Sequence, residues 1–235
     1  MIDYKKYFCS LLLNLSLACC VTGQDVTTLV QQVRNKLDLV NDYEAAGKMK
    51  TNVSFLKVPV ANVKVYYKKP GKLKIKNEKG FSFIPRGAVN INMSNILNSG
   101  RFTVLDAGAD KLGNTVVKVV KLLPEDDNAD VVLSTLYIDE GRLLVLKAKT
   151  TTRDNGSYEL EMNYGKYAQY GLPDKVIFSF NTKEYKLPKG VTFDFADGAE
   201  KNPADKVKGK KEKGRAEIDI RSYDINKGVL DAVFQ

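Results

Sequence analysis

The sequence of 235 residues contains no histidine and no tryptophan, and its cysteines all lie within the first 20 residues. Histidine is the commonest general base and the commonest metal ligand in proteins. Without histidine or a later cysteine, the usual serine and cysteine triads and a thiolate metal site are excluded. No glycine-rich loop of the kind that cradles a phosphate is present either. We therefore expect a protein that is not an enzyme and that holds no metal or cofactor.

Residues 1–23 have the pattern of a cleavable secretory signal peptide. Lys5 and Lys6 precede an apolar stretch, residues 8–21. That stretch is shorter than the ~20 apolar residues needed to span a bilayer. Small residues lead up to Gly23, so a signal peptidase would leave Gln24 as the first mature residue. A buried N-terminal helix is the alternative interpretation.

The cysteines in this segment leave two states of the mature protein open. Residues 17–20 (LACC) partly resemble a lipobox, in which Cys19 or Cys20 would become a lipidated N-terminus. With Cys20 as the acceptor, a cysteine stands where glycine or alanine is usual, and Cys19 has less suitable residues before it. Cleavage between Gly23 and Gln24 fits better, so we expect release in soluble form, with lipid anchoring to a membrane as the alternative.

The hydrophobic pattern after residue 24 begins as a helix. Apolar residues recur at intervals of three and four from residue 26 to residue 40, behind Asp25 as N-cap, which predicts a helix ending near Asn41. From Glu44 onward the period is two, as in residues 63–67, 72–76, 157–164 and 216–221. Each run has one polar and one apolar face, as the strands of an antiparallel sheet do.

Turn sequences rich in glycine, asparagine and aspartate separate these runs, at residues 69–71, 77–80, 139–141 and 154–156. The chain has roughly ten or eleven such strands and no repeated helical crossovers. The fold class is therefore mainly β (α+β), with one long, strongly curved antiparallel sheet and helices on its concave face. We expect a single domain over residues 24–235. Residues 203–214 are predicted to form a loop rich in lysine and glycine.

A cavity remains on the concave side of such a sheet if helices do not fill it. The apolar strand residues would then either fill a core or line that cavity: Val63, Val65, Tyr67, Leu73, Ile75, Phe81, Phe83, Tyr158, Leu160, Met162, Phe178 and Phe180. A short helix around residues 90–97 could cover it with its apolar side, which consists of Ile91, Met93, Ile96 and Leu97. Because each buried CH₂ contributes ~0.8 kcal/mol, such a cavity could hold an acyl chain without polar contacts.

The formal net charge is +9, and basic residues are concentrated near the C-terminus. Six of them surround Glu212: Lys206, Lys208, Lys210, Lys211, Lys213 and Arg215. This run is either a solvated loop or a docking segment for an anionic membrane or an acidic partner, where each cation contributes ~1 kcal/mol. Nucleic acid is not expected as a partner, because no aromatic residues are interleaved for base stacking.

Several short segments of the chain, and the order in which they occur, resemble sequences of the LolA/LolB-like superfamily. This superfamily contains outer-membrane lipoprotein carriers and lipoprotein-sorting proteins of Gram-negative bacteria. The N-terminal helical pattern leads into residues 43–50 (YEAAGKMK), and a basic strand pair follows at residues 67–75 (YKKPGKLKI). Residues 170–176 (YGLPDKV) precede a late strand, and residues 223–228 (YDINKG) resemble the family's closing strand. The resemblance covers nearly the whole chain after residue 24.

The resemblance implies an open, incomplete β-barrel of about 11 strands, with helices as a lid over an apolar cavity. It implies a periplasmic, monomeric carrier that binds the acyl chains of lipoproteins or other lipids during transport to, or sorting at, the outer membrane. A protein-interaction or sensory module on the same fold, or a membrane-anchored lipoprotein receptor, is the alternative. The chain departs from the family in lacking tryptophan and in its lysine-rich loop. An arginine holds the lid in the family, and here Arg86 and Arg101 flank the expected lid helix.

Overall fold

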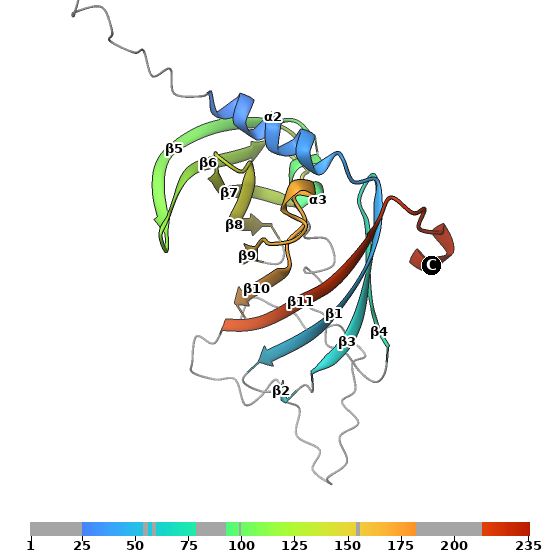
Figure 1. Cartoon of the computed structure of the whole chain (residues 1–235). Coiled ribbons are helices and arrows are strands. Elements are labelled where there is room, and N and C mark those ends of the chain that lie inside the picture. Colours follow the sequence, from blue (N-terminus) through green and yellow to red (C-terminus); the bar gives the residue numbers. More distant parts are fainter. Residues whose placement is uncertain are drawn as a thin grey trace, which may run out of the picture.

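The computed structural model describes residues 25–53, 56–57, 60–78, 93–98, 100–153, 156–181 and 213–235 (Figure 1). The helices are α2 (Val26–Leu37) and α3 (Met93–Asn98), with 3₁₀ turns η2 (Ala168–Tyr170) and η4 (Asp231–Phe234). The strands are β1 (Asp42–Val53), β2 (Leu56–Lys57), β3 (Ala61–Lys68), β4 (Lys72–Asn77), β5 (Phe102–Leu112), β6 (Thr115–Pro124), β7 (Val131–Asp139), β8 (Leu144–Thr152), β9 (Ser157–Asn163), β10 (Lys175–Asn181) and β11 (Lys213–Ile225).

The strands form one antiparallel sheet in the order β4-β3-β1-β11-β10-β9-β8-β7-β6-β5, with β2 paired to β1 alone. Within the described residues, β4 and β5 end the sheet and do not pair with each other, so the barrel stays open. Figure 1 shows the strong curvature of the sheet, with α2 running across one end and α3 inside the curve. The predicted fold class, an open and curved antiparallel sheet with helices on its concave face, is confirmed.

Helix α2 forms where the sequence places it, but it ends earlier than predicted. The Asp25 side chain accepts a hydrogen bond from the Thr28 N–H, and the apolar stripe from Val26 to Leu37 is buried. The prediction of an end near Asn41 is wrong. The N–H groups of Leu39 and Val40 turn back onto the carbonyls of Lys36 and Leu37, and β1 begins at Asp42. Val40 is therefore buried outside the helix, against Tyr67 and Leu172.

The main core lies between the two helices and one half of the sheet. Its members come from α2, α3 and strands β6 to β11, and they include the predicted Ile96 and Leu97 of α3. The predicted short helix is confirmed over Met93–Asn98. Since both helices are engaged over this half, the concave face formed by β1, β3 and β4 receives less cover from them.

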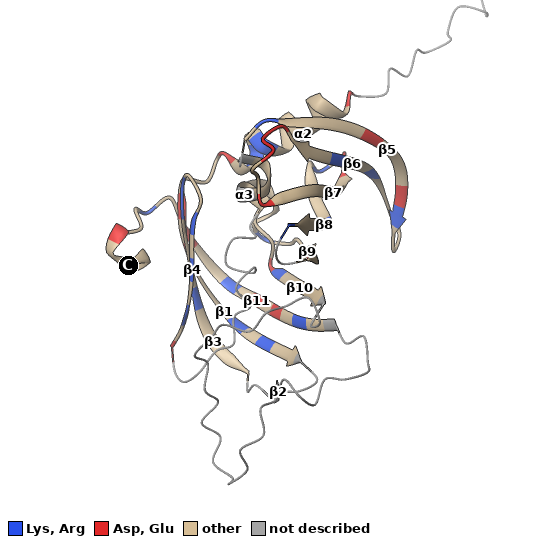
Figure 2. Ribbon diagram, turned by 180° about the vertical axis from the view of Figure 1, so that it is seen from behind, with Lys and Arg blue, Asp and Glu red and all other residues tan. Residues whose placement is uncertain are grey.

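The outer face of the sheet is polar and basic. In β3 the buried residues Val63, Val65 and Tyr67 alternate with the half-exposed Lys64, Tyr66 and Lys68. Figure 2 shows lysine and arginine distributed along β1, β3, β4 and β11. Lysines suit β4 because an edge strand with charged side chains resists pairing with other chains. Pairs such as Lys64 Nζ to Glu44 Oε1, 2.6 Å apart, are exposed and contribute little to stability.

Several predicted features lie outside the described residues. They are the signal segment with Cys19, Cys20, Gly23 and Gln24, the cavity candidates Phe81 and Phe83, the lid candidate Ile91, and Lys206, Lys208, Lys210 and Lys211. Strand β11 begins at Lys213, so the last two residues of the predicted loop belong to the sheet. Among the described residues, no helix combines the length and apolar character needed to cross a bilayer.

Candidate functional site

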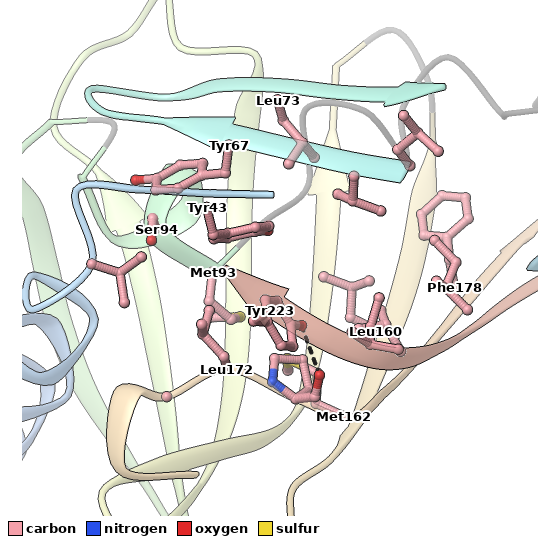
Figure 3. A pocket seen from close by; sticks show the side chains of 18 of the residues that line it. Tyr43, Tyr67, Leu73, Met93, Ser94, Leu160, Met162, Leu172, Phe178 and Tyr223 are labelled. Carbon is pink, nitrogen blue, oxygen red and sulfur yellow. Dashed lines mark hydrogen bonds between the residues drawn. The ribbon is translucent and has the colours of Figure 1, made fainter. Parts of the chain in front are cut away.

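An apolar cavity of ≈ 120 Å³ lies between the concave face of the sheet and the helices (Figure 3). Strands β1, β3, β4, β9, β10 and β11 supply most of its lining, and the end of α2 with the turn after it, the start of α3 and the loop after η2 supply the rest. The lining residues are Leu37, Val40, Tyr43, Met49, Val65, Tyr67, Leu73, Ile75, Met93, Ser94, Leu160, Met162, Gly171, Leu172, Pro173, Val176, Phe178, Ala216, Ile218, Ile220 and Tyr223.

Small residues help to explain why space remains here. Between Tyr43 and Met49, the inward-facing positions of β1 carry only Ala45 and Gly47. Gly47 has no side chain to fill the concave face, and a Cβ at this position would collide with the carbonyl oxygen of Asp219 on β11. The two strands therefore approach closely at a point where the face of the sheet stays bare.

The structure brings seven of the predicted strand candidates into the cavity wall: Val65, Tyr67, Leu73, Ile75, Leu160, Met162 and Phe178. Of the lid candidates, Met93 also lines it. Three strand candidates lie elsewhere. Val63 packs with Met49 and Ala61 in a separate cluster, whereas Tyr158 and Phe180 belong to the main core.

Several lining residues were not predicted from the sequence. Ile218 and Ile220 alternate visibly within the last predicted strand, so their inward direction could have been read from the sequence. Tyr43 and Tyr223 carried no such signal, because they meet only when β1 pairs with β11. Leu172 and Pro173 lie in an irregular loop, where no periodicity marks a buried side.

Tyrosines form a connected aromatic cluster along one side of the cavity. Tyr43 stacks on Tyr67, directly opposite it on β3, with ring centroids 5.2 Å apart. Tyr223 meets Tyr43 edge to face at 5.2 Å and Tyr167 at 4.9 Å. The Tyr223 hydroxyl donates to the Pro173 carbonyl at 2.8 Å, which ties β11 to the loop after η2. Such pairs contribute ~0.5–1.5 kcal/mol each beyond their burial, so this wall of the cavity is held firmly.

Buried tyrosines should make the fold sensitive to alkali. Burial raises the pKa of Tyr43, Tyr164 and Tyr223, and it raises the pKa of Tyr158 to about 12. The pKa of Tyr158 in the folded protein lies above its unfolded value of 10.0. The folded state therefore keeps its full stability below pH 10 and loses stability as the pH rises toward 12. At ~1.4 kcal/mol per pKa unit, Tyr158 alone accounts for a loss of roughly 2–3 kcal/mol in the free energy of unfolding.

We expect the free energy of unfolding in urea to fall steeply above pH 10, and the fall to be smaller in Tyr158→Phe. Tyrosinate absorbance should follow the unfolding transition. A folded protein in which every tyrosine ionises near pH 10 would contradict this expectation.

An arginine links the two helices. Arg34 of α2 donates from Nη2 to the backbone carbonyl of Leu97, in the last turn of α3. That carbonyl has no partner within the helix, so the guanidinium satisfies a group that the helix end leaves open. Arg101, which flanks the predicted lid helix, pairs with Glu125 instead, with Nε and Oε2 3.6 Å apart. Among the described residues, Arg34 is therefore an arginine that holds α3, and its position in the last turn of α2 gave no sign of this in the sequence; the other flanking arginine, Arg86, lies outside the described residues.

Comparison with known structures identifies the fold. A LolA superfamily protein from Nitrosomonas europaea superposes with a TM-score of 0.54 at 10% identity, over 88% of this chain and 97% of that one. A DUF1329 family protein from Desulfovibrio piger gives 0.54 at 12%, over 88% and 95%. An outer membrane lipoprotein-sorting protein domain from Vibrio parahaemolyticus gives 0.51 at 12%, over 88% and 94%. No protein-family model and no curated protein matches the sequence. The chain has the LolA-like fold.

Proposed function

We propose that this protein is a periplasmic carrier that binds the acyl chains of lipoproteins or other lipids during their transport to, or sorting at, the outer membrane. The observation that supports this most is the apolar cavity between the sheet and the helices, whose lining is almost entirely hydrocarbon and aromatic. Two proteins of the same fold are described as a lipoprotein-sorting domain and a LolA superfamily member. The absence of histidine from the whole sequence supports binding rather than catalysis.

The cavity must expand to take a full acyl chain. Its volume of ≈ 120 Å³ is below the ~300–1,000 Å³ usual for ligand sites. We expect helix α3 to move when the cavity expands, because it is short. Its buried apolar residues, among those described, are Met93, Ile96 and Leu97. Exposing all three would cost roughly 5–9 kcal/mol, whereas burying a chain of about 15 methylenes is worth ~12 kcal/mol. An acyl chain can therefore displace α3 and still bind with a net gain.

The contact between Arg34 and α3 should slow that displacement. We expect Arg34→Met to raise the association rate of a fluorescent fatty acid about fivefold or more, and to lower the free energy of unfolding by about 1–2 kcal/mol. Stopped-flow fluorescence measures the rate. The matched control is Lys36→Met, because Lys36 lies on the same helix but donates to the Arg142 carbonyl at 2.6 Å. Equal association rates in the two variants would show that Arg34 does not restrain the lid.

Mass spectrometry under native conditions tests the function itself. Protein purified from cells that contain bacterial membranes should carry bound lipid or lipoprotein, with masses that differ by acyl-chain length. The proposal fails if no acyl species ever copurifies and if fatty-acid probes do not bind.

The small volume of the cavity favours one alternative, a protein-interaction or sensory module on the same fold. In that function the cavity stays closed, and the outer surface contacts a protein partner. Such a protein would show saturable binding to a protein partner and no exchange of acyl probes. The fatty-acid measurement therefore separates the two functions.

The location of the mature protein and its contact with membranes belong to the same proposal. Sequencing of the mature N-terminus distinguishes release at Gln24 from anchoring, as a receptor, at a lipidated Cys19 or Cys20. The lysine-rich residues 203–214 stay predicted as a docking segment for an anionic membrane, from their charge alone.

A further inference from the structure

One polar group in the cavity wall has a proton without an acceptor at ordinary hydrogen-bond geometry. The Tyr67 side chain is only 1% exposed, and its hydroxyl makes no hydrogen bond of ordinary length and angle within the described part of the chain. The Ser94 side chain, at the start of α3, lies beside it (Figure 3). A buried hydroxyl without a partner is destabilising, and native proteins seldom leave one unsatisfied. Because Ser94 belongs to α3, the movement of α3 that ligand entry requires would bring this hydroxyl within reach of a ligand atom.

The other tyrosines of the wall do not share this property. The Tyr223 hydroxyl already donates to the Pro173 carbonyl at 2.8 Å. Tyr43 lies between the rings of Tyr67 and Tyr223 and contributes its faces and edges to the aromatic cluster. Among the residues that the structure describes, Tyr67 is thus the tyrosine of the wall whose hydroxyl is buried and has no acceptor at ordinary hydrogen-bond geometry.

The ligand group must be a hydrogen-bond acceptor. Burial raises the pKa of Tyr67, while a hydrogen bond donated by the Ser94 hydroxyl and the charge of the Lys69 ammonium oppose the rise. The Tyr67 hydroxyl therefore keeps its own proton at neutral pH and can donate it to an acceptor. A charged carboxylate would be costly in this apolar surrounding without a paired cation. A neutral carbonyl oxygen fits better, since it accepts a hydrogen bond and carries no net charge.

We propose that the Tyr67 hydroxyl donates a hydrogen bond to the carbonyl oxygen of an acyl group, as an ester or an amide, and so selects acylated ligands over alkyl ones. Figure 3 shows Tyr67 and Ser94 at one end of the drawn lining and Phe178 and Leu160 at the other. The carbonyl lies at the Tyr67 end, beside α3, and the hydrocarbon extends toward Phe178. This inference rests on the proposed carrier function and names the chemical group that the carrier recognises.

A pair of ligands that differ at the carbonyl tests the inference. Lysophosphatidylcholine with a hexadecanoyl ester and its hexadecyl ether analogue share a head group and a chain length. Competition against a bound fluorescent fatty acid, below the micellar concentration of both, gives their affinities. We expect the wild-type protein to bind the ester about tenfold more tightly than the ether, because a site that is built to hydrogen-bond a group rejects the analogue without it.

Tyr67→Phe should abolish this preference and leave the affinity for the ether unchanged. The matched control is Tyr223→Phe, which makes the same change in the same wall to a hydroxyl that is already bonded within the protein. It should keep the tenfold preference and lower the urea midpoint. Tyr67→Phe should leave that midpoint unchanged or raise it, because the buried hydroxyl that it removes has no acceptor in the unliganded protein.

The outcomes separate the inference from the proposed function. If neither lipid binds, the carrier function fails, and the role of Tyr67 fails with it. If both lipids bind equally to the wild-type protein, or if Tyr67→Phe keeps the preference, the carrier function stands and the role of Tyr67 is wrong. A clearly lower urea midpoint for Tyr67→Phe would show that the hydroxyl has a partner within the protein, which also overturns the inference.

Discussion

Replacing Val65 with tryptophan should weaken the binding of a fatty-acid probe by about a hundredfold. Val65 is 7% exposed and lines the cavity from the inward face of β3. An indole ring there would occupy space that the acyl chain needs. If it excludes about four methylenes, the loss is ~3 kcal/mol, which corresponds to roughly a hundredfold in affinity. Equilibrium titration with a fluorescent fatty acid measures the effect.

The matched control for this variant is Asn62→Trp. Asn62 lies on the same strand, points outward and is exposed, so an indole there should leave the affinity unchanged. Urea denaturation shows which role Val65 has. In a filled core, the larger side chain would cost ~1–3 kcal/mol of stability through overpacking. In a cavity wall it would cost less. A Val65→Trp protein that binds the probe as tightly as the wild type would contradict the placement of the ligand.

Local patterns in the sequence predicted the elements of this fold well. The stripe from Val26 to Leu37 forms one face of α2, and the alternation of β3 sets Val65 and Tyr67 on the concave side. Both patterns act over a few residues, where hydrophobic period and structure correspond directly. Val40 shows the limit of this reasoning. It continues the helical spacing, yet the chain turns before it and buries it in a different cluster.

The cavity could be predicted only in part, because its composition depends on contacts between distant segments. Leu160, Met162 and Phe178 line the cavity, whereas Tyr158 and Phe180, which have the same alternation on the same two strands, do not. Tyr158 and Phe180 are paired at one end of β9 and β10, beyond the cavity, and strand periodicity carries no information about position along a strand. Arg34 is a similar case, since its contact with Leu97 joins residues on two separate helices.

In the proposed carrier function, the Tyr67 hydroxyl and the closed position of α3 both affect the free energy of ligand binding. A carrier has to release its cargo, so the unliganded cavity should leave some groups unsatisfied, and α3 should be able to move. Helix α3 is held in place by the buried side chains of Met93, Ile96 and Leu97 and by the Arg34 guanidinium. Under the proposed carrier function, the cost of moving α3 is below the gain from burying a long acyl chain, and the difference limits the affinity.

Gly47→Ala should lower the free energy of unfolding by about 2–4 kcal/mol, a large effect for one methyl group. An ideal Cβ at Gly47 would lie 2.5 Å from the backbone carbonyl oxygen of Asp219. The carbonyl belongs to β11, and the register between β1 and β11 shifts at Ala46 and Gly47, so the clash falls on a β-bulge that sets their close approach. Because backbone atoms cannot rotate away as a side chain can, the two strands must separate.

Urea denaturation measures the loss, and Gly141→Ala is the matched control. At Gly141 an added Cβ would meet only the Asp139 Oδ1 atom at 3.6 Å, an ordinary contact, so the same change should be nearly neutral. Equal midpoints for the two variants would refute the structural role of the bulge. The pairing of β1 with β11 also places Tyr43 beside Tyr223 and brings Ile218 into the wall. Gly47→Ala should therefore weaken acyl binding as well, while Gly141→Ala leaves it intact.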